Sequence, residues 1–512
     1  METRAFESVR GPVVRKVYKI MGTSTANTFI VHNSSLPNLR RAVYERVLNV
    51  PVEGGYAKPP LPAGNVFNVR LESFKRRILC ELPFLAPMSR NEFADSYRGQ
   101  KRTVYQRAVA SLEVEAISSR DAHSKAFLKA EKIPTSLLKP DPAPRIIQPR
   151  DPRYNVEVGR YLKVAEAVVY KAIKRVFGFS TVAKGYNSDG VARLIVGKWN
   201  YFVDPIAIGL DASRFDQHIH IQALRWEHSV YNAIFHSTEL RELLDMQLHN
   251  ICHARCNEGT VKYRTQGCRL SGDMNTSLGN CLIMCALVWS YADERGIPIQ
   301  MVNNGDDCTV FMERRYEELF RNGLEQWFTE MGFTMKVEPT AQVLEQIDFC
   351  QASPVFDGEN WLMVRNPFRS CAKDSLVMID IAHPKAFEMY RRARADCGMA
   401  LTGGLPVLQE FYLAYGRDAV LKGKMNRRSD WEDGLVIMSR NMTREYGPVS
   451  DAARVSFYLA FGITPDQQVH AEEYFAQLRL SYSKPVELES SRERLSNLPP
   501  AILFNGNFHQ VV

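Results

Sequence analysis

The stretch MVNNGDDCTV, residues 301–310, sets two acids, Asp306 and Asp307, side by side behind Asn-Gly. Asn-Gly and Gly-Asp favour tight turns, and the apolar residues on both sides read as strands, so the stretch predicts a β-hairpin. The like charges of the two carboxylates repel each other, and a divalent cation between them would remove that cost. A turn without any chemistry also explains the tripeptide, so a metal site requires further acids.

Further acids occur in IAIGLDASRFDQHI, residues 206–219. Its first apolar residues alternate with small ones, which predicts a strand that buries them and turns Asp211 to the opposite face at its end. Asp216 follows beyond the turn. If this strand lies beside the hairpin, Asp211, Asp306 and Asp307 can share two divalent metal ions. Such a pair of ions stabilises both the attacking and the leaving oxygen in phosphoryl transfer.

A third segment, SGDMNTSLGNCLIM, begins at Ser271 and lies between the two acid pairs. It predicts a turn followed by an apolar helix, on which Thr276 and Asn280 share one face because they are four residues apart. Hydroxyl and amide groups on that face are suited to bind a sugar hydroxyl. Alternatively, Asn275 and Thr276 only cap the helix. The position between the acid pairs favours sugar binding.

The composition is that of a globular protein with a mild positive charge. Of the 512 residues, 45% are hydrophobic and 24% are charged, and the net charge is +8. Residues 125–163 hold nine basic and four acidic side chains, so the positive charge is concentrated there. Six prolines in residues 134–152 exclude a long helix and favour a stiff extended segment. A basic segment of this kind suits phosphate binding, and a solvated basic surface is the alternative.

The cysteine content and the hydropathy indicate the redox compartment and the relation to membranes. Ten cysteines in 512 residues are too sparse for a disulfide framework and favour a reducing compartment. The longest apolar stretch, residues 278–292, is shorter than the roughly 20 residues of a membrane span, and no signal peptide opens the chain. We therefore expect no transmembrane segment and an indirect association with any membrane. One cluster, HNICHARC, contains His249, Cys252, His253 and Cys256 and could bind zinc. We expect instead that these four are ordinary residues of a helix.

The pattern changes along the chain. Residues 51–65 are rich in proline and glycine and predict a loop or linker after a short N-terminal piece. Residues 200–350 alternate between short strands and helices, which predicts a mixed α+β core. Beyond residue 375 the pattern is mainly helical, so we expect a helical lobe to follow the core.

The ordered motifs DASRFD, SGDMNTSLGN and NGDD resemble motifs A, B and C of viral RNA-dependent RNA polymerases. The wider sequence is similar to the replicases of the tombusvirus family of plus-strand plant viruses, with matches such as DPAPRIIQPRDPRYN and IDFCQASPVFDG between about residues 70 and 465. The resemblance implies an α+β right-hand polymerase with fingers, a palm built on a small antiparallel sheet, and a helical thumb. The implied regions are an N-terminal extension and linker at 1–65, fingers with motif F at 66–207, a palm at 208–360 with a fingers insertion at about 217–270, and a motif E edge with the thumb at 361–512.

The resemblance also implies roles for individual residues. Asp211 and Asp306 would be the principal ligands of two Mg²⁺ ions, with Asp307 in support and Mn²⁺ as an alternative ion. Lys336 follows a predicted amphipathic helix that ends at Gly332, and it would protonate the pyrophosphate leaving group; an exposed strand lysine is the alternative. The residues implied to bind the sugar of the nucleotide are Asp216, Ser271, Thr276 and Asn280. Those implied to face the triphosphate are Lys129, Lys132 and Arg145, with Arg150 and Lys139 as weaker matches, and those near the priming nucleotide are Arg365 and Lys373.

Basic and aromatic side chains interleave in SYRGQKRTVYQRA, residues 96–108. Aromatic rings can stack on bases while cations bind phosphates, so this segment predicts a groove that admits a template strand. The side chains concerned are Tyr97, Arg98, Lys101, Arg102, Tyr105 and Arg107.

These features predict an RNA-directed RNA polymerase that initiates without a primer. A reverse transcriptase is the nearest alternative, but it typically has an aromatic residue before the paired aspartates, where this chain has Asn304-Gly305. A non-catalytic RNA-binding protein would explain the charge but not three spaced acidic sites. The expected partners are template RNA, NTPs, a viral auxiliary replication protein and host factors. The expected location is the host cytoplasm, at membrane-bound replication complexes.

Overall fold

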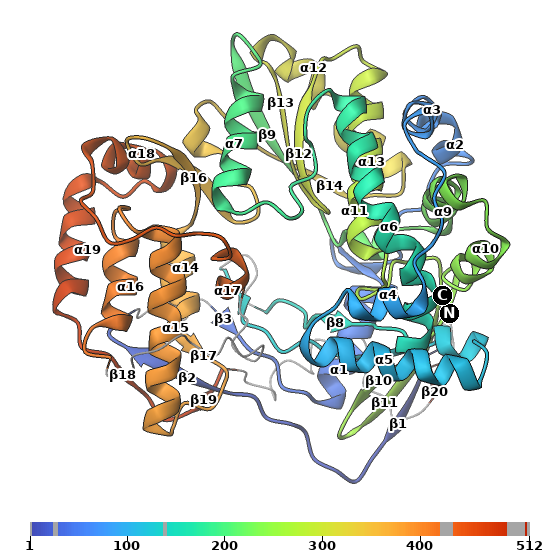
Figure 1. Cartoon of the computed structure of the whole chain (residues 1–512), viewed down its shortest axis with the longest axis horizontal. Helices are drawn as coiled ribbons and strands as arrows, with labels where there is room; N and C mark the ends of the chain where they lie inside the picture. Colours follow the sequence, from blue (N-terminus) through green and yellow to red (C-terminus); the bar gives the residue numbers. More distant parts are fainter. Residues whose placement is uncertain (1–2, 24–28, 137–140, 420–433, 489–506, 509–512) are drawn as a thin grey trace.

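The computed structural model describes residues 3–23, 29–136, 141–419, 434–488 and 507–508. Helices and strands are mixed along the chain, as expected for an α+β fold. Figure 1 shows three groups of elements arranged in a ring: a four-stranded sheet with its helices at the top, a six-stranded sheet with helices at the lower right, and the C-terminal helices at the left.

The four-stranded sheet is antiparallel, in the order β12-β13-β9-β14. In β9, Ile206, Ile208 and Leu210 belong to the largest apolar core, whereas Ala207 packs in a second core on the other face. Asp211 is exposed at the end of the strand. The alternation predicted for this segment is therefore confirmed. The strands are β9 (Pro205–Ala212), β12 (Gln300–Asn304), β13 (Asp307–Glu313) and β14 (Met335–Ala341).

Helix α11 (Thr276–Asp293) runs through the largest core and is buried on all sides from Leu278 to Val288. A helix that is apolar all round is typical of such a position. In the part of the chain that the structure describes, no helix is long and apolar enough to cross a membrane. The neighbouring helices are α2 (Val66–Arg70), α3 (Glu72–Cys80), α4 (Arg90–Asp95), α5 (Gly99–Val114), α6 (Pro152–Phe177), α7 (Ser188–Trp199), α8 (Phe215–His218), α9 (Ile221–Phe235) and α10 (Thr238–Asp245).

The single helix predicted to end at Gly332 is instead two short helices, α12 (Glu317–Arg321) and α13 (Leu324–Glu330). Gly323 separates them with φ +74°, a left-handed conformation that glycine adopts at little cost. The sequence predicts an apolar stripe of Leu319, Leu324, Trp327 and Phe328; the last three are buried, but Leu319 is 47% exposed and Phe320 is buried in its place.

Residues 249–256, predicted to be helical, form strand β10 (His249–Cys256). The helix prediction was wrong, because burial alternates residue by residue, with Cys252 and Ala254 in a core beside helix α1 (Leu36–Val43). Cys252 and His253 therefore point to opposite faces of the sheet and cannot bind one metal ion. The sheet has the order β20-β1-β11-β10-β6-β8; its other strands are β1 (Thr3–Glu7), β6 (Ser124–Leu128), β8 (Ile146–Ile147), β11 (Gly259–Gln266) and β20 (Asn507–Phe508).

The N-terminal strands pair with two different groups of elements. β1 belongs to the six-stranded sheet, whereas β2 (Lys16–Met21) pairs with three short strands of the C-terminal part. The segment expected to be a linker contains a small hairpin, β4 (Val50–Val52) with β5 (Gly55–Ala57). The partners of β2 are β17 (Leu376–Val377), β18 (Ser481–Tyr482) and β19 (Val486–Glu487), and β3 (Phe29–Ile30) pairs with β7 (Ile133–Pro134).

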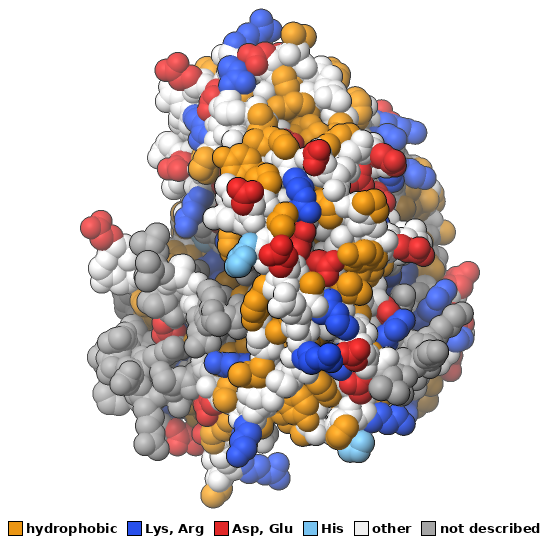
Figure 2. All heavy atoms as spheres, turned by 90° about the vertical axis from the view of Figure 1, so that its left-hand side faces the viewer, with side chains coloured by type: hydrophobic (Ala, Val, Ile, Leu, Met, Phe, Trp, Pro, Cys, Tyr) orange, Lys and Arg blue, Asp and Glu red, His pale blue; other side chains and the backbone are white. Residues whose placement is uncertain are grey.

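The C-terminal part is mainly helical, as predicted, and has a core of its own. A hairpin of β15 (Ala352–Phe356) and β16 (Trp361–Arg365) joins it to the four-stranded sheet. Figure 2 shows its outer face, with basic, acidic and apolar side chains interspersed and no large patch of one charge among the coloured residues. The helices are α14 (Pro367–Asp374), α15 (Pro384–Thr402), α16 (Leu408–Gly416), α17 (Leu435–Met438), α18 (Asp451–Phe461) and α19 (Pro465–Gln477).

Candidate active site

Three aspartates meet where strands of the four-stranded sheet end. β9 and β13 pair in a register that sets Asp211 opposite Asp307, and Asp306 comes immediately before, in the turn of the β12–β13 hairpin. Gly305 in this turn has φ +92°, a conformation that a tight hairpin turn demands. The structure thus brings the three acids together, as the sequence predicts: Asp306 and Asp307 lie in the hairpin, and Asp211 lies on the neighbouring strand.

Burial and mutual repulsion destabilise the charged forms of these acids. Asp306 and Asp307 reach solvent, yet protein surrounds much of each carboxylate. Burial, followed by repulsion from Asp307 and Asp216, raises the pKa of Asp306 to about 6. Burial also raises the pKa of Asp307, although a hydrogen bond with the Cys350 thiol opposes the rise. Carboxylates crowded in this way favour the binding of a cation.

Glu338 and Asp348, two acids that were not predicted from the sequence, lie next to this group. Burial, followed by repulsion from Asp348, Asp211 and Asp307, raises the pKa of Glu338 on β14. Glu338 leans across β9 at Gly209, where a Cβ atom would collide with its carboxylate. The signal in the sequence is slight: Glu338 stands two residues after Lys336 and therefore on the same side of an extended segment.

The donor set fits hard divalent cations. In the described ranges, no three His, Cys, Asp or Glu side chains are already arranged around one point to hold a metal ion. Mg²⁺, however, commonly takes only one or two carboxylates and completes its shell with water and substrate phosphates. Carboxylate oxygens from Asp211, Asp306 and Asp307 are ligands of the type that Mg²⁺ prefers. The cluster therefore suits ions that arrive together with a phosphorylated substrate.

Lys336 lies on the other side of Asp211 from Asp307. It is the backbone partner of Asp211 in the pairing of β14 with β9, and its side chain is exposed. Partners directly opposite in an antiparallel pair carry their side chains on the same face. An acid and a cation are therefore neighbours at the edge of the acidic cluster.

Asp216 is held between two of the predicted sugar-binding residues. Its carboxylate accepts a hydrogen bond from the Ser271 hydroxyl at 2.5 Å and another from the Asn280 amide nitrogen at 2.7 Å. Thr276 lies at the start of the same helix, but its hydroxyl donates to the carbonyl of Leu270 at 3.1 Å. The structure therefore brings Asp216, Ser271 and Asn280 together, and Thr276 supports the turn that carries Ser271.

Lys129 and Arg145 stand opposite each other at the end of the β6–β8 pair. The Lys129 amide donates to the carbonyl of Arg145 at 2.9 Å, and both side chains form ion pairs with Glu131, at 2.9 and 3.3 Å. Arg145 is also close enough to Asp306 to lower the pKa of that acid. Arg145 therefore lies near the acidic cluster, and Glu131 links it to Lys129.

Lys132 is placed differently. Its side chain is buried, and its ammonium donates to the carbonyls of Lys373 at 2.7 Å and Leu376 at 2.9 Å. Lys132 thus joins the β6–β8 region to the C-terminal part and is occupied by these carbonyls. Lys139, the other lysine of this stretch, lies outside the described residues.

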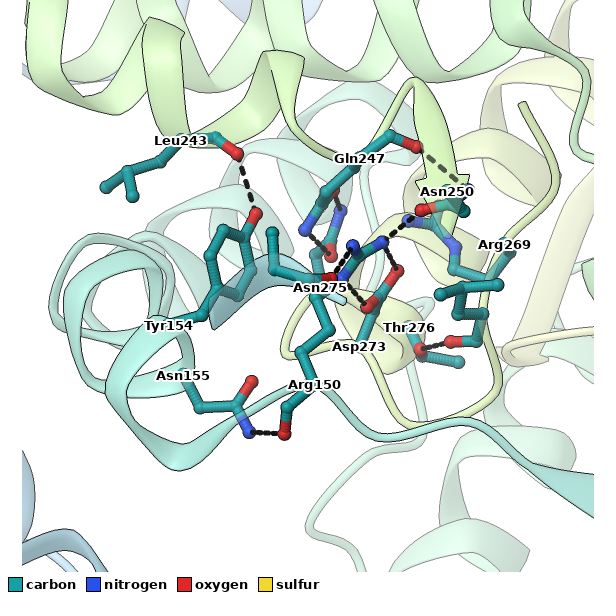
Figure 3. A network of polar contacts seen from close by, with 12 residues as sticks. Arg150, Tyr154, Asn155, Leu243, Gln247, Asn250, Arg269, Asp273, Asn275 and Thr276 are labelled. Carbon is teal, nitrogen blue, oxygen red and sulfur yellow. Dashed lines mark hydrogen bonds and ion pairs between the residues drawn. The ribbon is translucent and has the colours of Figure 1, made fainter. Parts of the chain in front are cut away.

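Arg150 is buried in a polar network shown in Figure 3. Its guanidinium binds Asp273 at 2.5 Å, the side chain of Asn250 at 2.6 Å and the carbonyl of Ala122 at 2.7 Å. Composition alone cannot distinguish a buried cation of this kind from one that faces a ligand. Because Asp273 follows Ser271 closely, Arg150 fixes the turn that positions the Ser271 hydroxyl.

Arg365 lies at a pocket of about 810 Å³ between the hairpin at Asn304 and the C-terminal helices. Its guanidinium donates to Asp374 at 2.7 Å and to the hydroxyl of Tyr412 at 2.5 Å. Lys373 precedes Asp374 at the end of α14. Of the two predicted priming residues, Arg365 lines this pocket, whereas Lys373 is not among the described residues that line it.

The predicted template groove is built around a packed aromatic cluster. Tyr97 and Tyr105 contact Phe93 with ring centroids 5.2 and 5.1 Å away. The ammonium groups of Lys163 and Lys101 lie over the Tyr97 ring at 3.9 and 4.6 Å. The two tyrosines and the two lysines line a pocket of about 560 Å³ that Gly272 and Met274 also border. Of the other predicted side chains, Arg102 forms an ion pair with Asp95 at 2.8 Å.

Comparisons with known proteins agree with this arrangement. Residues 3–483 match the family described as viral RNA dependent RNA polymerase. The chain is 42% identical over 482 residues to the RNA-directed RNA polymerase of Turnip crinkle virus, an alignment that covers 93% of the chain and 62% of that protein. It is 43% identical over 458 residues to the enzyme of Melon necrotic spot virus, covering 89% of the chain and 58% of that protein. The corresponding values for Pothos latent virus are 44% over 459 residues, 90% and 61%.

The chain spans about three fifths of the length of these relatives. The match nevertheless extends across nearly all of the chain, and it includes the acidic hairpin, the Asp211 strand and the Ser271 turn. The chain therefore belongs to the family of viral RNA-dependent RNA polymerases and is similar throughout to its tombusvirus-family members, as its motifs indicated.

Proposed function

We propose that this chain replicates the genome of a plus-strand RNA virus by transferring a nucleotidyl group from an NTP to an RNA 3′-hydroxyl, with release of pyrophosphate. The observation that carries the proposal is the pairing of Asp211 with Asp307, beside Asp306, at one end of the sheet. Carboxylates at such a place are what nucleotidyl transfer requires. Relatives about 40% identical to the chain are named RNA-directed RNA polymerases.

The right-hand arrangement follows as part of the proposal. The four-stranded sheet with α11 would be the palm, the six-stranded sheet with α4 and α5 the fingers, and helices α14 to α19 the thumb. The ring of three groups in Figure 1 supports this assignment. In such a hand the acids face the space into which a template and a nucleotide enter.

Asp211, Asp306 and Asp307 would hold two Mg²⁺ ions. Bound there, the ions would activate the 3′-hydroxyl and neutralise charge on the reacting phosphate. The crowding that raises the pKa of Asp306 supports this role, since it is relieved when positive charge is present. Glu338 and Asp348 are close enough to influence the same ions.

The remaining side chains would orient the nucleotide. Arg145 and Lys129 would bind the triphosphate, with Glu131 holding them in place beforehand. Asp216 and Asn280 would meet the 2′-hydroxyl of the ribose. Lys336, next to Asp211, would give a proton to the departing pyrophosphate.

One face of the six-stranded sheet suits the template. Register places Arg4, Lys262, His253 and Lys125 in one row across four strands, on the face opposite to α1. Burial and the nearby cations Lys262, His123 and Arg255 lower the pKa of His253, which indicates a positive potential. Exposed aromatic rings beside a row of cations are typical of single-stranded RNA binding; the rings here are Phe6 and Phe127, which are 48% and 47% exposed.

We also propose initiation without a primer. Arg365 lines the pocket that begins beside the acidic hairpin, and Lys373 directly precedes Asp374, the ion-pair partner of Arg365, so these two cations could hold the triphosphate of a first nucleotide. Recruitment to membrane-bound complexes in the host cytoplasm, with an auxiliary viral protein and host factors, rests on the similarity to plant-virus replicases.

The deciding experiment incubates purified chain with an unprimed RNA template, Mg²⁺, and labelled NTPs or dNTPs. We expect template-length RNA from NTPs, and none from the Asp306→Ala variant or after chelation of Mg²⁺. Incorporation of dNTPs as efficient as that of NTPs would identify a reverse transcriptase. Tight RNA binding by a correctly folded chain that makes no product would favour the non-catalytic alternative.

A further inference from the structure

A completely buried ion pair lies directly behind the residues that would meet the sugar. Arg269 and Glu227 are both 0% exposed, and the guanidinium contacts both carboxylate oxygens. Burial of this kind is costly unless the remaining donors and acceptors are also satisfied. The third nitrogen of the Arg269 guanidinium, Nε, therefore also requires a partner.

This third nitrogen fixes the side-chain amide of Asn280. Its Nε atom donates to Oδ1 of Asn280 at 3.2 Å, while Nδ2 of Asn280 donates to Asp216 at 2.7 Å. If the amide turned over, its oxygen would face the Asp216 carboxylate and its nitrogen would face the guanidinium, and both contacts would be repulsive. Arg269 thus holds Asn280 in the orientation that binds Asp216.

Glu227 in turn holds the guanidinium. Its Oε1 atom accepts hydrogen bonds from Asn275 at 2.7 Å and from the Tyr231 hydroxyl at 2.8 Å. Asn275 is further bound to Gln247 at 3.1 Å, in the network of Figure 3. A Cβ atom at Gly279 would collide with both Arg269 and Glu227, so the pair packs directly against the backbone of α11 next to Asn280. The guanidinium therefore has no room to move.

We propose that Arg269 is a positioning residue for sugar selection: through Asn280 it holds Asp216 ready for a ribose 2′-hydroxyl. The inference rests on the proposed polymerase function and adds a residue that does not touch the nucleotide. A site whose polar groups are held in place discriminates strongly against a substrate that lacks the matching hydroxyl, because those groups are left unpaired. Loosening Asn280 should therefore reduce the preference for NTPs over dNTPs.

Arg269→Lys is the sharpest test. Lysine keeps the positive charge beside Glu227 but cannot bind Glu227 and Asn280 with separate donors of one rigid fork. We expect the ratio of kcat/KM for ATP to that for dATP to fall about fivefold, the value of one buried hydrogen bond, with most of the loss on ATP. Tyr291→Phe is the matched control. Tyr291 is a buried residue of α11, the helix that carries Asn280, and its hydroxyl donates to the carbonyl of Phe320, away from Asn280. The control should lose thermal stability without a change in the ratio.

A double-mutant cycle separates positioning from a general structural role. If Arg269 acts through Asn280, then Arg269→Lys should not lower the ratio further in an Asn280→Ala background. Additive losses, or an unchanged ratio in Arg269→Lys while Asn280→Ala lowers it, would overturn the inference and leave the polymerase function intact. Absence of NTP incorporation by the wild type would instead contradict the proposed function itself. Should Arg269→Lys not fold, Glu227→Gln weakens the anchor of Arg269, and the same cycle with Asn280→Ala applies.

Discussion

Asp211 on β9 and Lys336 on β14 are direct partners across the sheet, so a metal-ligand candidate and a cation are neighbours on the same face. If Lys336 gives a proton to pyrophosphate, both Lys336→Met and Lys336→Arg should lower kcat by about a hundredfold, since arginine keeps the charge but does not release its proton. The measurement is single-turnover incorporation of one nucleotide. Full activity in Lys336→Arg would show that only the charge matters.

Replacing Asp306 by alanine should abolish synthesis while the affinity for template RNA is retained. If Asp306 holds a metal ion at the reacting phosphate, its removal costs several kcal/mol at that step alone, which lowers the rate by about three orders of magnitude or more. Product formation and RNA binding are measured side by side, with Glu359→Ala, an exposed acid in the β15–β16 turn, as the control. A residual rate above about a tenth of the wild type would remove Asp306 from the metal site.

Arg145→Lys should raise the KM for NTPs far more than it weakens RNA binding. Arginine can bind a phosphate with two parallel hydrogen bonds, and lysine cannot reproduce that geometry. Arg175→Lys is a suitable control because Arg175 is also exposed and ion-paired, with Glu81. Equal KM values for the wild type and Arg145→Lys would exclude a contact between Arg145 and the triphosphate.

Unprimed synthesis should depend on Lys373 and Arg365 more than primer extension does. The first nucleotide brings a triphosphate to the priming position, whereas an RNA 3′ end brings none. Lys373→Ala, alone and with Arg365→Lys, is compared with the wild type in both assays; lysine at 365 preserves a charge near the buried Asp374. Equal losses in the two assays would refute the assignment.

Acid should destabilise the protein through His228. Burial, with a smaller contribution from Arg269, lowers the pKa of His228 to about 4, although Glu227, Asp245 and a hydrogen bond with Gln247 oppose the change. His228 is therefore protonated below about pH 6.5 in the unfolded chain, but only below about pH 4 in the folded protein. The free energy of unfolding should fall between these values by up to about 3 kcal/mol, and stability is unaffected by this group above pH 6.5.

His228→Asn isolates this contribution because asparagine does not titrate. Chemical unfolding at pH 7 and at pH 4.5 gives the two free energies for each protein. The variant should show the smaller difference between the two pH values. An identical pH dependence in both proteins would mean that His228 is not responsible.

The sequence predicts an element well where its burial pattern is regular. Alternation at Ile206, Ile208 and Leu210 identified β9, and Asn-Gly identified the hairpin, because one physical preference dominates each segment. In β10 the buried face holds Asn250, Cys252 and Ala254, which are neither large nor uniformly apolar, so no clear alternation marks this strand in the sequence.

Charged residues are harder to interpret because their roles depend on tertiary neighbours. Lys132 and Arg150 stand in the same basic segment as Arg145, yet both are buried in protein contacts. Arg269 was overlooked because its partner Glu227 is 42 residues away, and no local pattern connects the two. Composition located the basic region, but only the fold separates the cations that support the site from those that face it.

The pairing of β2 has a consequence for protein synthesis. Residues 16–21 leave the ribosome long before their partners, because β18 and β19 lie at residues 481–487. At translation rates of roughly 5 to 20 residues per second, β2 waits about 20 to 90 seconds for β18 and β19. The edge of β2 that faces β18 and β19 stays unpaired during that interval, even after β17 has been made, and an open strand edge favours aggregation or capture by chaperones. Strands made at residues 481–487 therefore complete a sheet whose central strand was made at residues 16–21, and a nascent chain stopped before residue 481 lacks these contacts.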